Sequence, residues 1–347
     1  MYLNSIKNFR ALAIILIVAV HSFSFASIPF KTFPSQFLGN LISGGTTLFV
    51  FISGLLFFHV FYKRYTFRSF MAGKVRNVVI PYTILSIIPI WMVMNQAKIP
   101  WPFFEPTGPG FIEETLVPAL KYYVTGRFAT AYWYIPFIVV TFLMSPLHIA
   151  YIRLNIRWQI VIMAVLFAVS AVVQRPQENI NTLQSVVAFT PVYLLGITCG
   201  MNLQWLYDKL TGREWIFAAI GLALAALEYT TGAFSNYHKD FFALKGIDLM
   251  LFQKVSWCIF FLIFLHRFEN WSPRWVNTIA ATSFAIFFLH PFFLKTLHTI
   301  RNFYGVRFDG SWTVYWAAVA LVTGLSIATA LAVRAIIGKN SRYLIGY

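Results

Sequence analysis

The stretch RALAIILIVAVH, residues 10–21, has an arginine and a histidine at the two ends of ten uninterrupted apolar residues. Eleven steps of about 100° come to about 20° more than three full turns, so on an α-helix Arg10 and His21 lie on the same face. With a rise of about 1.5 Å per residue they are about 16 Å apart along the axis, roughly half the thickness of the hydrocarbon core of a bilayer. If Arg10 lies at one membrane surface, His21 lies near the midplane.

The whole chain has the composition of a membrane protein. Of its 347 residues 59% are hydrophobic and 11% are charged, against roughly 25% charged residues in a soluble domain. Apolar stretches near the roughly 20 residues that a spanning helix needs recur along the sequence, and the strands of a membrane barrel would instead alternate over about ten residues. We predict one all-α integral-membrane domain, residues 1–347, with about ten transmembrane helices. The expected spans are 9–28, 41–62, 77–97, 130–152, 158–173, 183–206, 214–232, 246–265, 275–298 and 312–337, of which 158–173 and 214–232 have the weakest signals.

The basic residues predict the orientation. If the N-terminus is cytoplasmic, 16 of the 27 Lys and Arg residues fall on the inner side, the bias that the positive-inside rule expects. Both termini are then cytoplasmic. The net charge of +16 reflects this inner collar of basic residues rather than a nucleic-acid groove, because the basic residues flank apolar spans. We therefore expect no nucleic-acid partner.

Ionisable side chains inside the spans are the first candidates for chemistry, because they cost several kcal/mol unless they are satisfied. His21 and His290 qualify, and each suits proton transfer at neutral pH. Each can also be a structural histidine that bonds a neighbouring helix, with Arg10 extending to the inner headgroups. Glu228, near the outer end of an apolar stretch, could pair with a base or bind a hydroxylated ligand. Cys199 and Cys258 lie within spans, so we expect core thiols and no metal site.

A basic cluster over residues 63–76 leads into the third span. It can be an ordinary topology signal that contacts lipid phosphates. Alternatively Arg64, Arg68, Lys74 and Arg76 converge on a phosphate-rich cytosolic ligand, for which arginine forks and lysine point charges are suited.

Five segments together resemble the membrane acyltransferase family 3, integral-membrane enzymes that acylate surface polysaccharides and some other acceptors. The first is similar to the family's Arg, ten residues, His signature, and the last to its closing Ser/Thr, aromatic, His-Pro element, which extends the match to His290. The segments are FRALAIILIVAVH (9–21), GGTTLFVFISGLLFF (44–58), FMAGKVRNVVIPY (70–82), AYWYIPFIVV (131–140) and SFAIFFLHPFF (283–293). The chain departs from the family at Ile135, where a leucine is usual, and at Thr46 and Thr47, where an acid is frequent. Residues 150–270 carry no match.

The resemblance implies a multi-pass protein of the bacterial cytoplasmic (inner) membrane with a cytoplasmic acyl-CoA donor, usually acetyl-CoA. It implies an acceptor hydroxyl on a surface glycan or its lipid-linked precursor, with the lipid bilayer as a further partner. Association with a second copy of the chain stays open. On this hypothesis Arg64, Arg68, Lys74 and Arg76 hold the donor phosphates. Arg10 positions the pantetheine end or stabilises developing charge.

In the catalytic step His21 takes the hydroxyl proton, or His21 or His290 carries the acyl group covalently; the sequence leaves both routes open. Two other functions also remain open. One is a transporter that exports the polysaccharide. The other is an acyltransferase whose acceptor is a small molecule or a lipid.

Overall fold

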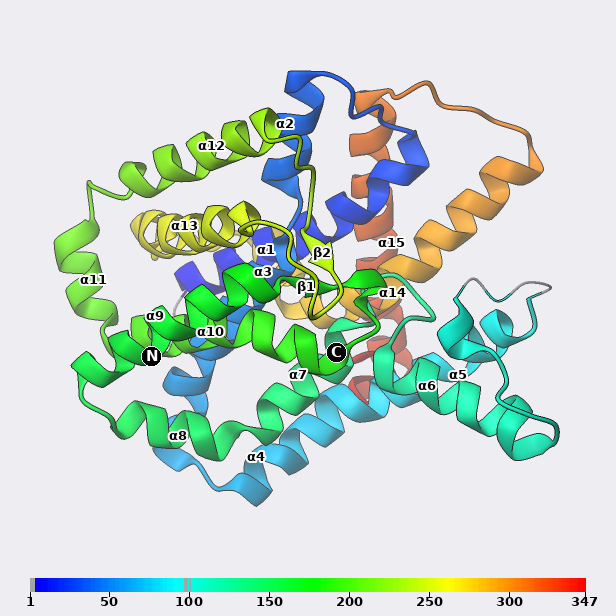
Figure 1. Cartoon of the computed structure of the whole chain (residues 1–347), viewed down its shortest axis with the longest axis horizontal. Helices are drawn as coiled ribbons and strands as arrows, with labels where there is room; N and C mark the ends of the chain where they lie inside the picture. Colours follow the sequence, from blue (N-terminus) through cyan, green and yellow to red (C-terminus); the bar gives the residue numbers. More distant parts are fainter. Residues whose placement is uncertain (1–3, 97–98, 100) are drawn as a thin grey trace.

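The computed structural model describes residues 4–96, 99 and 101–347 (Figure 1). These residues are mostly helical, with one pair of two-residue strands, β1 (Arg175–Pro176) and β2 (His238–Lys239), that pair in parallel. The α-helices are α1 (Asn4–Ala26), α2 (Phe33–Ile42), α3 (Gly45–Leu56), α4 (Phe67–Lys74), α5 (Ile80–Met94), α6 (Val117–Thr125), α7 (Tyr134–Leu143), α8 (Ser145–Arg153), α9 (Ile156–Val173), α10 (Thr182–Met201), α11 (Leu203–Leu210), α12 (Trp215–Thr230), α13 (Leu249–Phe264), α14 (Arg274–Phe303), α15 (Trp312–Ile337) and α16 (Ser341–Ile345).

The prediction of a polytopic helical bundle is confirmed. Among the described residues, eight helical segments are long and apolar enough to cross a membrane. Two bent pairs, α7 with α8 at 54° and α11 with α12 at 87°, raise the number to ten if each pair is one span. The two predicted spans with the weakest signals, 158–173 and 214–232, correspond to α9 and α12.

Close backbone contact joins α3 to α10 in the interior of the bundle. A Cβ atom at Gly54 would overlap the carbonyl oxygen of Tyr193, and one at Gly196 would overlap that of Phe51. In a bilayer, helices associate through dense packing at small residues because lipid tails are as apolar as leucine side chains. These two glycines therefore set the distance between α3 and α10.

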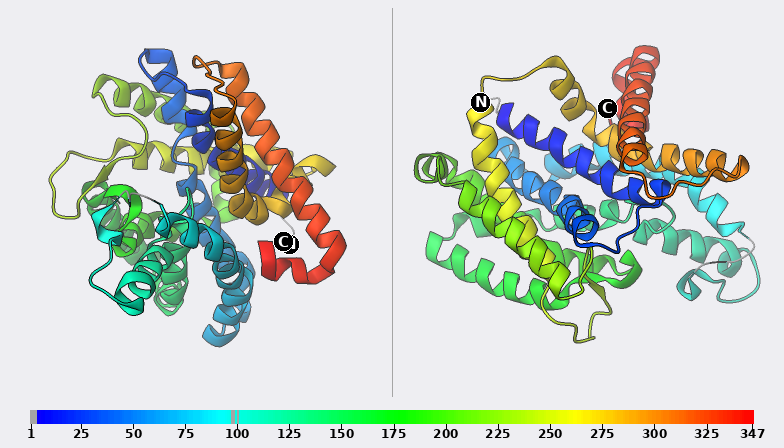
Figure 2. Two further views of the ribbon diagram at one scale, coloured as in Figure 1. Left: turned by 90° about the vertical axis from the view of Figure 1, so that its right-hand side faces the viewer. Right: turned by 90° about the horizontal axis from the view of Figure 1, so that it is seen from above.

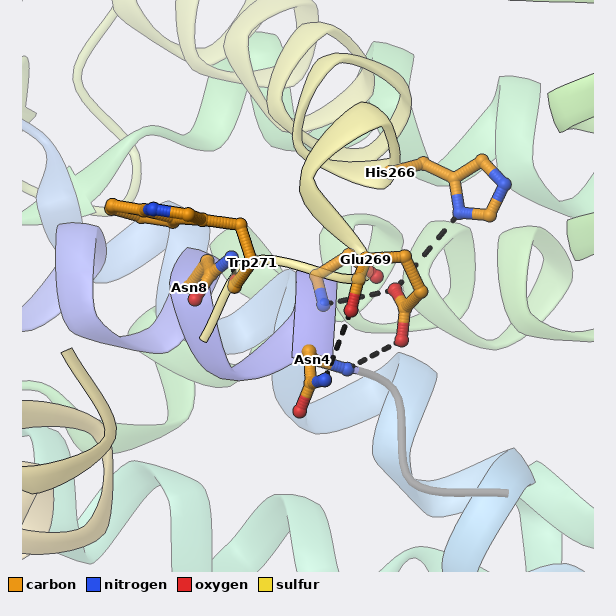
Figure 3. A network of polar contacts seen from close by, with 6 residues as sticks. Asn4, Asn8, His266, Glu269 and Trp271 are labelled. Carbon is orange, nitrogen blue, oxygen red and sulfur yellow. Dashed lines mark hydrogen bonds and ion pairs between the residues drawn. The ribbon is translucent and has the colours of Figure 1, made fainter. Parts of the chain in front are cut away.

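The first helix is fixed at its start by the segment that precedes α14 (Figure 3). The carboxylate of Glu269 accepts hydrogen bonds from the backbone N–H groups of Asn4 at 2.6 Å and Ser5 at 3.0 Å, and the Asn8 amide donates to the Trp271 carbonyl at 3.3 Å. A carboxylate at a helix N-terminus satisfies free N–H groups and complements the helix dipole. Because α14 begins just after this segment, α1 and α14 start at the same end of the bundle and pack in parallel (Figure 2, right).

The second span is longer than the predicted 41–62 and is broken. It runs from Phe33 to Arg64, and Gly44, with φ of 77°, separates α2 from α3. The break frees carbonyl groups at the end of α2, and an unsatisfied carbonyl inside a membrane is costly. The buried ammonium of Lys254, on α13, donates to the carbonyls of Asn40 and Leu41 at 2.9 Å each.

The two short strands join the loop after α9 to the loop after α12, at the ends of these helices that we predict to lie on the outer side of the membrane. His238 in β2 lies with Nδ1 2.8 Å from the carbonyl oxygen of Pro176 in β1, to which the ring N–H donates. Burial, together with the nearby Arg175, lowers the pKa of His238 to about 4. The ring is therefore neutral at pH 7 and keeps its hydrogen bond to β1.

Candidate active site

The structure brings His21 of α1 and His290 of α14 together. Their ring centroids are 5.5 Å apart, and the ring planes are 24° from parallel. His21 is 17 residues after the first residue of α1 and His290 is 16 residues after that of α14, so both lie about 25 Å from the shared start of the two helices. His21 is only five residues before Ala26. The pair is thus nearer the outer end of α1 than the end at which Arg10 lies.

Hydrogen bonds indicate where the protons of the pair lie. Nδ1 of His290 is 3.0 Å from the carbonyl oxygen of Ile286, which can only accept, so the neutral His290 ring carries its proton on Nδ1 and has its lone pair on Nε2. That Nε2 atom is buried and has no hydrogen-bond partner among the described residues. Nδ1 of His21 is 2.9 Å from the hydroxyl of Thr130, which can donate or accept.

A strained turn between α6 and α7 holds Thr130 in place. Ala131 has a φ of 67° and Gly126 a φ of 69°, and a positive φ at a residue other than glycine is an uncommon, costly conformation found often at functional sites. Tyr132 anchors the turn, because its hydroxyl donates to the carbonyl of Phe288 on α14 at 3.0 Å. Thr130 and Tyr132 were not among the predicted site residues.

Arg10 lies on the same face of α1 as His21 but does not reach the pair. Its guanidinium Nη2 donates to the hydroxyl of Ser283 on α14 at 2.8 Å. About 16 Å of helix separates Arg10 from His21. The arginine therefore links α1 to α14 at a point closer to the start of the two helices than the histidine pair.

A cavity of about 250 Å³ lies at the predicted inner side, between the end of the second span and the start of the third. Arg64, Lys74 and Asn77 contribute polar groups to its lining. The Lys74 ammonium lies against three rings, 4.5 Å from the centroid of Phe61, 5.0 Å from that of Phe70 and 4.2 Å from that of Phe142. The structure therefore brings two of the four predicted donor-binding residues together.

The other two predicted donor residues, Arg68 and Arg76, are exposed and do not line this cavity. Two π-helical segments, η1 (Phe57–Phe61) and η3 (Val75–Val79), form parts of the wall, and π-bulges in helices are frequent at functional sites. Asn77 has a buried Oδ1 atom without a hydrogen-bond partner in the described part of the chain. An incoming N–H or O–H group would satisfy this atom, and the two cations suit a phosphate.

A comparison with family models matches residues 3–333 to the family described as Acyltransferase domain. The chain belongs to the membrane acyltransferase family 3. Comparisons with curated proteins and with solved structures gave no match. The resemblance noted in five segments is thus confirmed over nearly the whole sequence, and this acyltransferase is a multi-pass integral membrane protein.

The acyltransferase also has a polar cavity of about 510 Å³ at the ends of α1 and α14 nearer the histidine pair. Ser27, Arg301, Arg307 and Asp309 are among its lining residues, and Arg301 also donates to the carbonyl of Phe25 at 2.7 Å. Ser27 is six residues after His21 in the sequence, about 9 Å along a helix. These arginines were not among the predicted site residues, because isolated basic residues beyond the predicted end of a span give no distinct signal.

Glu228 on α12 is fully buried, and neither carboxylate oxygen has a hydrogen-bond partner among the described residues. The ammonium of Lys254, on the adjacent helix α13, donates hydrogen bonds to the carbonyls of Asn40 and Leu41 in α2 instead. The structure thus places Glu228 in the interior, beside α13, and outside the linings of the inner cavity and of the cavity at the ends of α1 and α14.

Proposed function

We propose that this acyltransferase moves an acyl group, most simply acetyl, from cytoplasmic acyl-CoA to a hydroxyl of a cell-surface polysaccharide or its lipid-linked precursor in the bacterial cytoplasmic membrane. One observation carries the proposal: two stacked histidines lie inside the bundle, with a basic cavity on the predicted inner side and another at the outer ends of α1 and α14. A histidine that can accept a proton, placed between two cavities lined by arginine or lysine, suits an anionic donor on one side and a polar acceptor on the other.

In the proposed reaction, His21 Nδ1–H donates to Thr130 and the lone pair on His21 Nε2 accepts the acceptor's hydroxyl proton. The alcohol oxygen then attacks the thioester carbonyl, so that a C–O bond forms and the C–S bond breaks. The proton passes from the imidazolium to the departing thiolate, which leaves as coenzyme A thiol. In a second route the acyl group rests on a ring nitrogen of His21 or His290 before the hydroxyl attacks.

The donor's phosphates would bind at the inner cavity, where Arg64 and Lys74 lie. At about 250 Å³ this cavity is smaller than the roughly 300–1,000 Å³ of typical ligand pockets, so it suits part of the donor rather than the whole molecule. Its lining includes neither histidine, and the acyl-pantetheine arm must therefore pass between side chains to reach them. Aromatic rings are packed at both ends of this route: Phe70, which lines the cavity, touches Phe57, and Tyr134 touches Phe287, which touches His290.

Purified protein in liposomes, mixed with acetyl-CoA and surface glycan, tests the function. We expect free coenzyme A thiol to be released together with a glycan that gains one acetyl group, as detected by mass spectrometry. Movement of glycan across the liposome membrane without thiol release would instead support the transporter hypothesis. Thiol release with a small alcohol but not with glycan would change the acceptor and keep the enzyme class.

Replacing Lys74 with methionine should weaken donor binding specifically. Methionine keeps the contact with Phe61, Phe70 and Phe142 but removes the charge, and a hydrogen bond to a charged group contributes about 1.5–3 kcal/mol. We expect the KM for acetyl-CoA to rise roughly 10- to 100-fold with kcat nearly unchanged. Arg157→Met, at an exposed position at the start of α9, is the control for loss of one inner positive charge. Equal changes in KM in both variants would rule out a donor site at Lys74.

A further inference from the structure

A large apolar groove, about 730 Å³, lies between α5, α6, α7 and the start of α10. Figure 1 shows α5 and α6 next to each other at the edge of the bundle. Val79, Ile135, Val139, Val140 and Leu183 are among the apolar residues of its lining, and the Leu183 side chain is exposed. Because these helices belong to or adjoin membrane-spanning segments, the groove can hold a hydrocarbon chain without exposing it to water.

One wall of the groove separates it from the histidine pair. Tyr82 lines the groove, and its ring centroid is 5.9 Å from that of Tyr132. On its other side Tyr132 bonds to the α14 carbonyl of Phe288, two residues before His290, while Thr130 of the same turn bonds to His21. The strained turn thus has the groove on one side and the candidate active site on the other.

Polar and basic groups lie at the end of the groove formed by the loop after α6 and the start of α10. Thr125, Asn181 and Thr182 belong to the lining. The ammonium of Lys121 is 5.2 Å from the ring centroid of Phe103, which also lines the groove. Arg127, two residues after Thr125, forms an ion pair with Glu178. An apolar groove that ends near polar and cationic side chains matches a molecule with a long apolar chain and an anionic group at one end.

We infer that the groove binds the hydrocarbon chain of a lipid phosphate that carries the acceptor glycan, so that acylation takes place on the lipid-linked acceptor. This inference rests on the proposed function. A bilayer phospholipid would fill an apolar groove equally well. The shared wall favours the acceptor instead, since a chain in this groove places its head group next to the turn that holds Thr130 against His21.

Photo-crosslinking of the full-length protein in nanodiscs tests the inference, with a diazirine-bearing farnesyl phosphate as the probe. We expect labelled peptides to come from the groove, within residues 79–82, 135–140 and 180–183. Unlabelled farnesyl phosphate should prevent the labelling, and the same concentration of phosphatidylglycerol should not. Equal competition by phosphatidylglycerol, or equal labelling of the exposed face of α9, would show a bilayer lipid in the groove and overturn the inference.

A groove-filling variant provides a second measurement. Val139→Trp occupies part of the groove, and loss of contact with two methylene groups corresponds to about tenfold in affinity for the probe. Val165→Trp is the matched control, because Val165 is an exposed apolar residue on α9. Labelling that falls about tenfold in the first variant and not in the second supports the groove, and unchanged labelling in both contradicts it.

The failure of this inference can be separated from failure of the proposed function. His21→Gln should keep the probe labelling while acyl transfer is lost. Groove labelling without thiol release from acetyl-CoA would refute the proposed function and leave the lipid site standing. Equal acylation of the glycan with and without its lipid chain would refute the lipid-linked acceptor and leave the acyltransferase function standing.

Discussion

Replacing His21 with glutamine is expected to lower the rate of acyl transfer about 10²- to 10⁴-fold, the usual contribution of a general base. Glutamine retains a polar side chain of similar size, but it cannot take up a proton. The change should therefore appear in kcat, while the KM for acetyl-CoA and the thermal unfolding midpoint stay close to those of the parent protein. Thiol release from acetyl-CoA in the presence of glycan measures both kinetic constants.

His298→Gln is the matched control for this experiment. His298 also joins α1 and α14, with Nε2 3.3 Å from the hydroxyl of Ser24, but it lies eight residues beyond His290 on α14. This variant tests whether a weaker contact between the two helices is enough to stop the reaction. If both variants lose activity to the same extent, or if His21→Gln transfers acetyl at the parent rate, then His21 is not the base.

The fold was predictable because a membrane span requires about 20 consecutive apolar residues, and the hydropathy of the sequence shows such stretches directly. The breaks within the spans were not. The break at Gly44 depends on Lys254, a residue more than two hundred positions later that satisfies the freed carbonyls, and no local pattern reveals such a pairing. Likewise the span predicted over 130–152 is divided into α7 and α8, which are bent by 54° relative to each other.

The candidate site was predictable in part. Helical periodicity placed Arg10 and His21 on one face, and the position of His290 inside an apolar span singled it out before the family resemblance matched it. Helix geometry also explains why the basic cluster does not act as one group: Lys74 and Arg76 are two residues apart, so about 200° separates their directions on a helix, and they cannot both face the inner cavity. Thr130 was not predicted, because its contact with His21 depends on the conformation of a turn. The positive φ at Ala131 in this turn cannot be recognised from the residue types.

A single added methyl group at Gly196 should destabilise the protein. In Gly196→Ala the new Cβ would overlap the carbonyl oxygen of Phe51, a backbone atom that cannot rotate away, so α3 and α10 have to separate. Forcing extra volume into a packed interior costs about 1–3 kcal/mol, and occasionally more. We therefore expect a lower thermal unfolding midpoint in detergent and less folded protein in the membrane fraction.

Gly324→Ala on α15 is the control, since a Cβ there meets no atom within 4 Å. Alanine favours a helix over glycine by about 1 kcal/mol, so this variant should unfold at the same temperature as the parent or a higher one. The opposite signs of the two results would show that close approach of the α3 and α10 backbones, rather than glycine flexibility, requires Gly196. A Gly196→Ala protein as stable as Gly324→Ala would mean that the two helices are not in backbone contact at this crossing.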